Sequence, residues 1–135
     1  MKIRWLSAGI TTCLAVTMAL SSTAGSAIAK QKPEVRFHPV YKTATFIEDN
    51  WSSSNNQTTR EEKVWNYLNA RKNLLQFQDQ AQNHFQLKDV TKDPLGMTHY
   101  RLQEVYHGIP VYGSQQTIHS NQKGVFTTFM GQVIP

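Results

Sequence analysis

The sequence has 135 residues and a formal net charge of +5, with 14 lysines and arginines against 9 aspartates and glutamates. This length allows one small domain. The positive excess is mild and spread along the chain, without the basic stripe that nucleic-acid binding requires. The single cysteine is Cys13. The rest of the chain therefore has no thiol for a disulfide, a cysteine nucleophile or a cysteine-ligated zinc.

The first 29 residues have the pattern of a secretory signal peptide. Lys2 and Arg4 precede an apolar run over residues 6–20, and small residues follow, ending in Ala27-Ile28-Ala29. A basic start, a short apolar core and an A-x-A end are typical of such signals. The apolar run has about 15 residues, whereas a membrane span needs roughly 20. A secreted, extracellular protein is expected, with a retained membrane anchor as the alternative.

Residues 30–58 are predicted to form an extended N-terminal arm and loop. Pro33 and Pro39 interrupt the polar stretch that ends near residue 41. Thr43–Ile47 is a short β-prone stretch, and the polar residues 49–58 are typical of a loop.

A helix is predicted over about residues 60–76. Thr59 and Glu62 have the spacing of a capping box, in which each side chain accepts a hydrogen bond from the backbone N–H of the other residue. An apolar stripe that recurs near the helical period is expected to face the core, with Tyr67 at its flank. The stripe consists of Val64, Trp65, Leu68 and Leu75.

From residue 85 to residue 130 the pattern changes to short strands separated by turns. Strands are expected near residues 85–90, 97–106, 109–119 and 125–130, with turns at 93–96, 107–108 and 121–124. Regular turn spacing of this kind predicts an antiparallel β-meander. The predicted fold class is α+β, with one helix packed on this sheet.

The sequence shows no catalytic apparatus and no metal site. It contains no H-E-x-x-H, G-x-S-x-G or phosphate-binding glycine loop. The histidines are His38, His84, His99, His107 and His119. His99 and His119 are expected to face one another across the sheet, but two imidazoles without a third ligand make a poor zinc site. The chain itself is therefore expected to be no enzyme and to hold no cofactor.

Four segments in order resemble the fungalysin/thermolysin propeptide motif: residues 95–103 (LGMTHYRLQ), 106–113 (YHGIPVYG), 117–119 (TIH) and 123–125 (KGV). The pattern of that family is roughly L-G-x-T-H-x-R, then Y-x-G-[IV]-P-V-x-G, then T-[VI]-H and a glycine turn. The resemblance extends over residues 59–135 as a propeptide domain, and residues 114–116 (SQQ) depart from the glycines common after the second segment. The motif residues outside that segment are Gly96, Thr98, His99, Arg101, His119 and Gly124.

The resemblance implies a pro-segment of a bacillolysin-like neutral metalloprotease precursor, acting as an intramolecular chaperone and inhibitor. Its partner would be a thermolysin-like catalytic domain, in cis or in trans, and the only membrane contact would be transient, through the signal peptide. Zinc and calcium would belong to that catalytic domain, which this chain lacks. A free-standing secreted inhibitor or adaptor acting in trans is the alternative.

One segment is expected to face the protease, namely Tyr106, Gly108, Pro110, Val111 and Gly113. A proline has no N–H to donate to a strand partner, and a glycine permits a bulge or a close approach of another chain. The alternative is that these residues only stabilise the hairpin.

The signal peptide leads to the first prediction. N-terminal sequencing of the exported protein should begin at Lys30, because Ala27 and Ala29 provide the small side chains that signal peptidase requires. Recovery of the protein in the membrane fraction with Met1 at its N-terminus would instead establish an anchor.

Overall fold

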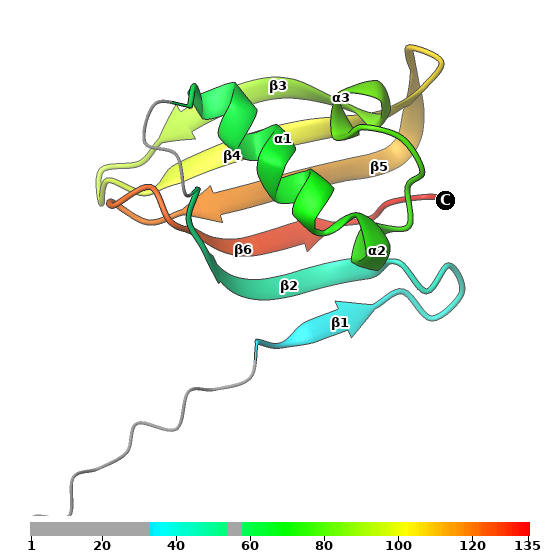
Figure 1. Ribbon diagram of the computed structural model, residues 1–135, viewed down its shortest axis with the longest axis horizontal. Helices are drawn as coiled ribbons and strands as arrows, with labels where there is room; N and C mark the ends of the chain where they lie inside the picture. Colours follow the sequence, from blue (N-terminus) through cyan, green and yellow to red (C-terminus); the bar gives the residue numbers. More distant parts are fainter. Residues whose placement is uncertain (1–32, 54–57) are drawn as a thin grey trace, which may run out of the picture. The chain divides into compact units, whose positions relative to one another are not determined.

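The computed structural model describes residues 33–53 and 58–135, so the expected signal peptide lies outside the described residues. Six strands form one antiparallel sheet, and three short helices lie against one of its faces (Figure 1). The predicted α+β class is confirmed. The strands are β1 (Val35–Phe37), β2 (Ala44–Trp51), β3 (Phe85–Lys92), β4 (Thr98–Tyr106), β5 (Ile109–Ser120) and β6 (Phe126–Gly131), and the helices are α1 (Arg60–Ala70), α2 (Lys72–Leu75) and α3 (Ala81–His84).

The strand order in the sheet is β1-β2-β6-β5-β4-β3. The four strands β3 to β6 are consecutive neighbours and form the predicted meander. The sheet is extended by β2, which pairs antiparallel with β6 although the helices and three strands separate the two in sequence.

The N-terminal segment expected as an arm and loop is part of the sheet. Both β1 and β2 come from residues 30–58, and β2 runs well beyond the β-prone stretch that ended at Ile47. The sequence pattern did not predict the second half of β2, because that half contains polar residues. Glu48 lies opposite Thr128 of β6 on the face without helices, while Asp49 points to the helix side and forms an ion pair with Arg71 at 2.5 Å.

The predicted helix begins as expected and ends sooner. The capping box is present, with the Glu62 N–H donating to Thr59 Oγ1 and the Thr59 N–H donating to Glu62 Oε2. At Arg71 the backbone leaves helical geometry, so the single helix expected over 60–76 is divided into α1 and α2. Gln76 then ends α2 in a left-handed conformation, with φ of 57°.

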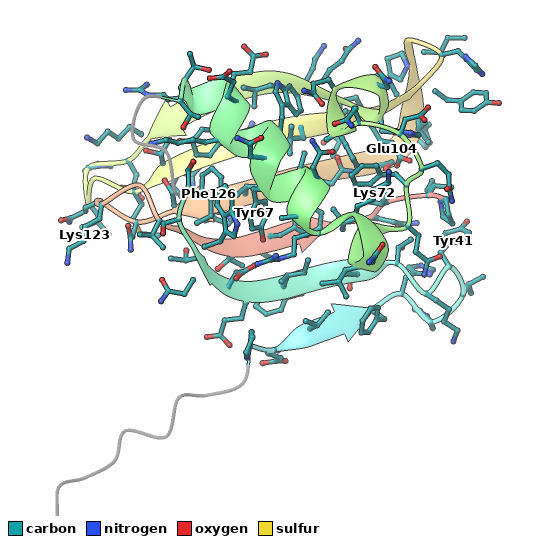
Figure 2. The ribbon with its side chains drawn as sticks, viewed as in Figure 1. Tyr41, Tyr67, Lys72, Glu104, Lys123 and Phe126 are labelled. Atoms are coloured by element: carbon teal, nitrogen blue, oxygen red, sulfur yellow. The ribbon has the colours of Figure 1, made fainter. Side chains whose placement is uncertain are left out.

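The core lies between α1 and the sheet. Val64, Tyr67 and Leu68 of α1 are fully buried, so Tyr67 lies at the centre of the apolar stripe and Trp65, which is half-buried, lies at its flank. Figure 2 shows Tyr67 against Phe126 of β6, and their ring centroids are 5.2 Å apart. Burial of such side chains contributes roughly 1.5–3 kcal/mol each to folding.

The opposite face of the sheet carries no helix in the described part of the chain (Figure 1). Antiparallel sheets commonly leave one face to solvent. The helices described here are all too short or too polar to serve as a membrane span.

Gly131, the last residue of β6, leads to the second prediction. Its φ is 138°, and an added Cβ would overlap the carbonyl oxygen of Gln115 and lie 2.6 Å from Cα of Gln116. Because backbone cannot yield as a flexible side chain does, Gly131→Ala should lower the free energy of unfolding by about 2–4 kcal/mol.

Gly124→Ala is the matched control, to be measured with the same denaturant titration. Gly124 also has a positive φ, 75°, but a Cβ there meets nothing within 4 Å. It should cost only about 1–2 kcal/mol of backbone strain. Equal losses for the two variants would show that the close contact at Gly131 has no energetic weight.

Candidate functional site

The β4–β5 hairpin holds the segment that the sequence marked as protease-facing. Its two-residue turn is His107-Gly108, with φ of 47° and 80°, and Tyr106 pairs with Ile109 across it. Two successive positive φ angles define the type I′ turn, whose twist matches that of the flanking strands.

Beyond the turn, β5 bulges. Pro110 pairs with Val105 and Gln115 with Gln103, so four residues of β5 oppose a single residue of β4. Gly113 lies in this bulge with φ of 77°. The side-chain nitrogen of Gln103 lies 2.8 Å from the carbonyl oxygen of Val111 and 3.0 Å from that of Ser114, so one amide fixes both ends of the bulge. Pro110 stands at the start of the strand, as its missing N–H requires.

Three large apolar side chains are exposed at this end of the hairpin, and together they are called the hairpin-tip surface. Tyr106 is 69% exposed, Ile109 68% and Tyr112 100%. Tyr106 and Ile109 are cross-strand partners, and Tyr112 follows three residues after Ile109 on β5. Clustered exposed apolar groups mark interaction surfaces on soluble proteins. Half-buried Val111 instead faces a cavity of about 270 Å³. The walls of that cavity include Phe77, Val105, Tyr106, Val133 and Ile134.

A buried polar cluster beside this surface was not found from the sequence. Glu104, 5% exposed, accepts hydrogen bonds from Ser114 Oγ and from the backbone N–H of Ile134 at 3.0 Å. The side chain of Gln116 donates to the carbonyl oxygen of Gln132 at 2.6 Å. Glu104 lies at the same end of the sheet as the C-terminus (Figures 1 and 2), and the cluster fixes the direction in which residues 132–135 leave β6.

The sequence did contain a signal for this cluster. Tyr100 and Leu102 are buried on the helix side of β4, and alternation places Glu104 on that same side. A carboxylate at an inward position of an otherwise apolar series requires partners. The residues that depart from the family pattern, Ser114 and Gln116, provide them.

His99 and His119 face one another as expected. They pair in register on β4 and β5, and their Nδ1 atoms are 2.6 Å apart. The Nε2 of His99 lies 3.1 Å from Asp93 Oδ2. Within residues 33–53 and 58–135, no group of three or more histidine, cysteine, aspartate or glutamate residues is arranged to hold a metal ion.

Two pKa shifts accompany this arrangement. Burial, and then the nearby charge of His99, lowers the pKa of His119. Desolvation favours protonated Asp93, but hydrogen bonds from His99 and from the Met97 backbone outweigh it and lower the pKa of Asp93.

The remaining motif residues lie away from the hairpin-tip surface. Gly96 and Gly124 occupy turns with φ of 81° and 75°, and with Thr98 they line one shallow pocket. These turns are at the opposite end of β4 from Tyr106, about 30 Å away for nine residues at roughly 3.4 Å each. Arg101 lies near the middle of β4, where it pairs with Asp89 of β3 and Thr117 of β5. The motif therefore divides into two separate groups.

Comparison with known proteins identifies the meander. Residues 83–133, which include all of β3 to β6, match the Fungalysin/Thermolysin Propeptide Motif. These residues belong to the fungalysin/thermolysin propeptide family. No solved structure gives a significant match.

Relatives of the chain include bacillolysins, thermolysins and neutral proteases. The chain is 35% identical over 136 residues to bacillolysin of Brevibacillus brevis, covering 100% of this chain and 25% of that protein. It is 31% identical over 140 residues to bacillolysin of Bacillus cereus, covering 100% and 24%. Over 109 residues it is 35% identical to thermolysin of Alicyclobacillus acidocaldarius subsp. acidocaldarius, covering 81% and 19%. The chain thus spans about a fifth to a quarter of the length of these relatives and matches the N-terminal region of their precursors.

The type I′ turn of the propeptide leads to the third prediction. Gly108→Val should lower the free energy of unfolding by about 1–3 kcal/mol, because a β-branched residue is strained at φ of 80°. A Cβ at Gly108 meets nothing within 4 Å, so the cost is conformational and not steric crowding. Gly108→Asn is the control, since asparagine tolerates left-handed backbone. If denaturation shows valine and asparagine to be equivalent, the turn does not depend on this conformation.

Proposed function

We propose that this chain is the exported pro-segment of a thermolysin-like zinc metalloendopeptidase, and that it assists the folding of the catalytic domain and inhibits it. The observation that carries the proposal is the family match over the complete four-strand meander. Similarity along the whole chain to bacillolysins supports it. Zinc and calcium are assigned to the catalytic domain, and proteolysis is assigned to it as well. The basic and apolar start of the sequence supports secretion.

The physical reason for such a segment is kinetic. Large secreted proteases are often protected by high unfolding barriers, and the same barriers slow folding. A partner that binds the native-like state lowers the barrier, and a covalent tether raises its effective concentration to about the millimolar range. Because this domain has no disulfide and is small, we expect marginal stability, which suits a segment removed by proteolysis.

We propose that the hairpin-tip surface is the part of the chain that contacts the catalytic domain. Tyr106 and its neighbours expose apolar area that folding of the propeptide does not bury. The turn at Gly108, the start of β5 at Pro110 and the bulge at Val111 and Gly113 together hold this surface in one shape. Aromatic side chains presented on a rigid hairpin bind with little loss of conformational entropy.

A free-standing inhibitor acting in trans is the second candidate, and it would use the same surface without the tether. The reading frame beyond Pro135 separates the two candidates. Continuation into a domain with H-E-x-x-H supports the pro-segment, and a stop codon supports the free-standing inhibitor.

The fourth prediction tests the surface in a chimeric precursor that joins this propeptide to the rest of the Brevibacillus brevis bacillolysin precursor. Tyr106→Ser and Tyr112→Ser should each lower the yield of active protease at least threefold, because the catalytic domain loses an apolar contact. Because both side chains are exposed, the free energy of unfolding of the propeptide, measured by denaturation, should change by less than about 0.5 kcal/mol.

Leu95→Ser is the matched control. Leu95 is 70% exposed and lies at the opposite end of β4, so its replacement should leave the yield unchanged. Equal losses of yield at all three positions, or none, would remove the hairpin-tip surface from the proposal.

The same proposal places proteolysis in the catalytic domain, so the purified propeptide should hydrolyse no casein. Hydrolysis that persists through purification would contradict that assignment.

A further inference from the structure

The cross-strand pair His99–His119 lies apart from the hairpin-tip surface, on the face of the sheet without helices. One oxygen of Asp93 contacts Nε2 of His99, and the other accepts the N–H of Met97 at 2.9 Å. The rings of His99 and His119 meet edge to face, with centroids 4.9 Å apart. The three side chains therefore connect the turn at 93–97 to β4, and β4 to β5.

The number of protons on the pair decides whether the Nδ1–Nδ1 contact holds. A neutral imidazole carries one N–H, so His99 with its Nε2–H directed at Asp93 has a bare Nδ1 that accepts from His119 Nδ1–H. One added proton is accommodated. His99 then carries hydrogens on both ring nitrogens and donates from Nδ1, while the single hydrogen of His119 moves to Nε2 and leaves its Nδ1 free to accept.

A second added proton breaks the contact. Both Nδ1 atoms then carry hydrogens directed at each other across 2.6 Å, and two positive rings face one another on adjacent strands. Neither imidazolium can accept a hydrogen bond. The contact must open.

The surroundings of the pair do not compensate for the second charge. Thr91 of β3 lies beside His99, and Thr128 of β6 lies beside His119. Charged groups on this face from the neighbouring strands and the turn include Asp93, Arg101 and Glu48, and β3 adds Lys88 and Asp89, which line one pocket with Arg101. Of these, Asp93 already contacts His99. Among the described residues, no carboxylate lies within hydrogen-bonding distance of His119.

We propose that His99 and His119 form an acid-operated lock in this propeptide, which ties β4 to β5 until the pair takes up its second proton. The lowered pKa of His119 agrees with that geometry. A consequence for the protease rests on the proposed function: acid loosens the propeptide that the catalytic domain binds.

The pH window follows from the direction of the shift. A histidine whose pKa is lower in the folded than in the unfolded state stabilises the fold above its unfolded pKa, about 6.5, and this stability is lost as pH falls toward the folded pKa. The unfolding equilibrium constant should therefore rise by up to about tenfold per pH unit below pH 6.5. Asp93 acts in a separate window, because a lowered carboxyl pKa withdraws stability only below about pH 4.

The fifth prediction concerns the slope of the unfolding equilibrium constant against pH, which is measured by chemical denaturation of the full chain between pH 7.5 and pH 4.5. His119→Gln keeps an amide donor for His99 but cannot be protonated, so the rise of the unfolding constant below pH 6.5 should be at least threefold smaller than in the wild type. His107→Asn is the matched control. It removes an exposed imidazole at a positive φ that asparagine tolerates, and it should keep the wild-type slope.

Nitrogen NMR of the unmutated chain gives a second readout that does not depend on a variant folding. At pH 7.5 the proton on His99 should be on Nε2, and His119 should take up its added proton below about pH 6.5, the value for a histidine in an unfolded chain. A His119 that is protonated at or above pH 6.5, or equal slopes for His119→Gln and the wild type, would overturn the lock. Neither measurement involves the protease, so failure of the lock and failure of the proposed function remain distinguishable.

Discussion

Three aromatic rings from three different elements meet on Phe126. Trp51 of β2 stacks on it with centroids 5.6 Å apart, and Tyr67 of α1 and Tyr100 of β4 meet it edge to face at 5.2 and 5.3 Å. These contacts join the added strand, the meander and the helix in one cluster. Buried aromatic side chains contribute more apolar area than other residues do. In a chain with no thiol after Cys13 to form a disulfide, this cluster and the β2–β6 strand pairing together connect the two parts of the sheet.

The meander was predictable because each of its turns carries a residue suited to left-handed backbone. Gly96, Gly108 and Gly124 all have positive φ and separate strands of alternating burial. The capping box at Thr59 was predictable for a similar reason, since it depends on a local spacing alone. By contrast, β2 was not predictable over its full length, because Asp49 occupies an inward position through an ion pair with Arg71, 22 residues away. Local patterns cannot reveal a partner at that separation.

The candidate site shows the same division between local and distant causes. The turn at 107–108 and the bulge near Gly113 follow from the conformational freedom of glycine, and the facing of His99 and His119 follows from strand register. The Glu104 cluster combines β4, β5 and the C-terminal segment, so alternation could identify its inward carboxylate but not its partners. The exposure of Tyr106 and Tyr112 also depends on the tertiary fold, because a strand pattern does not say which apolar residues remain uncovered.

The placement of polar groups in this propeptide favours geometry over stability. A buried carboxylate is costly unless every oxygen has a partner, and apolar substitutes of equal volume often stabilise a protein more. The side-chain nitrogen of Gln116 donates to the carbonyl oxygen of Gln132, and Glu104 accepts the backbone N–H of Ile134. Thr43 Oγ1 donates to the carbonyl oxygen of Val133 at 2.8 Å. Three successive residues after β6 are thus held by side chains from β5, from β4 and from the segment before β2. These buried hydrogen bonds to residues 132–134 fix the direction in which the chain leaves the sheet, beside the exposed hairpin tip. For a domain proposed to present a surface to a tethered partner, a fixed exit limits the orientations that the partner can adopt, and so raises the effective concentration in the productive one.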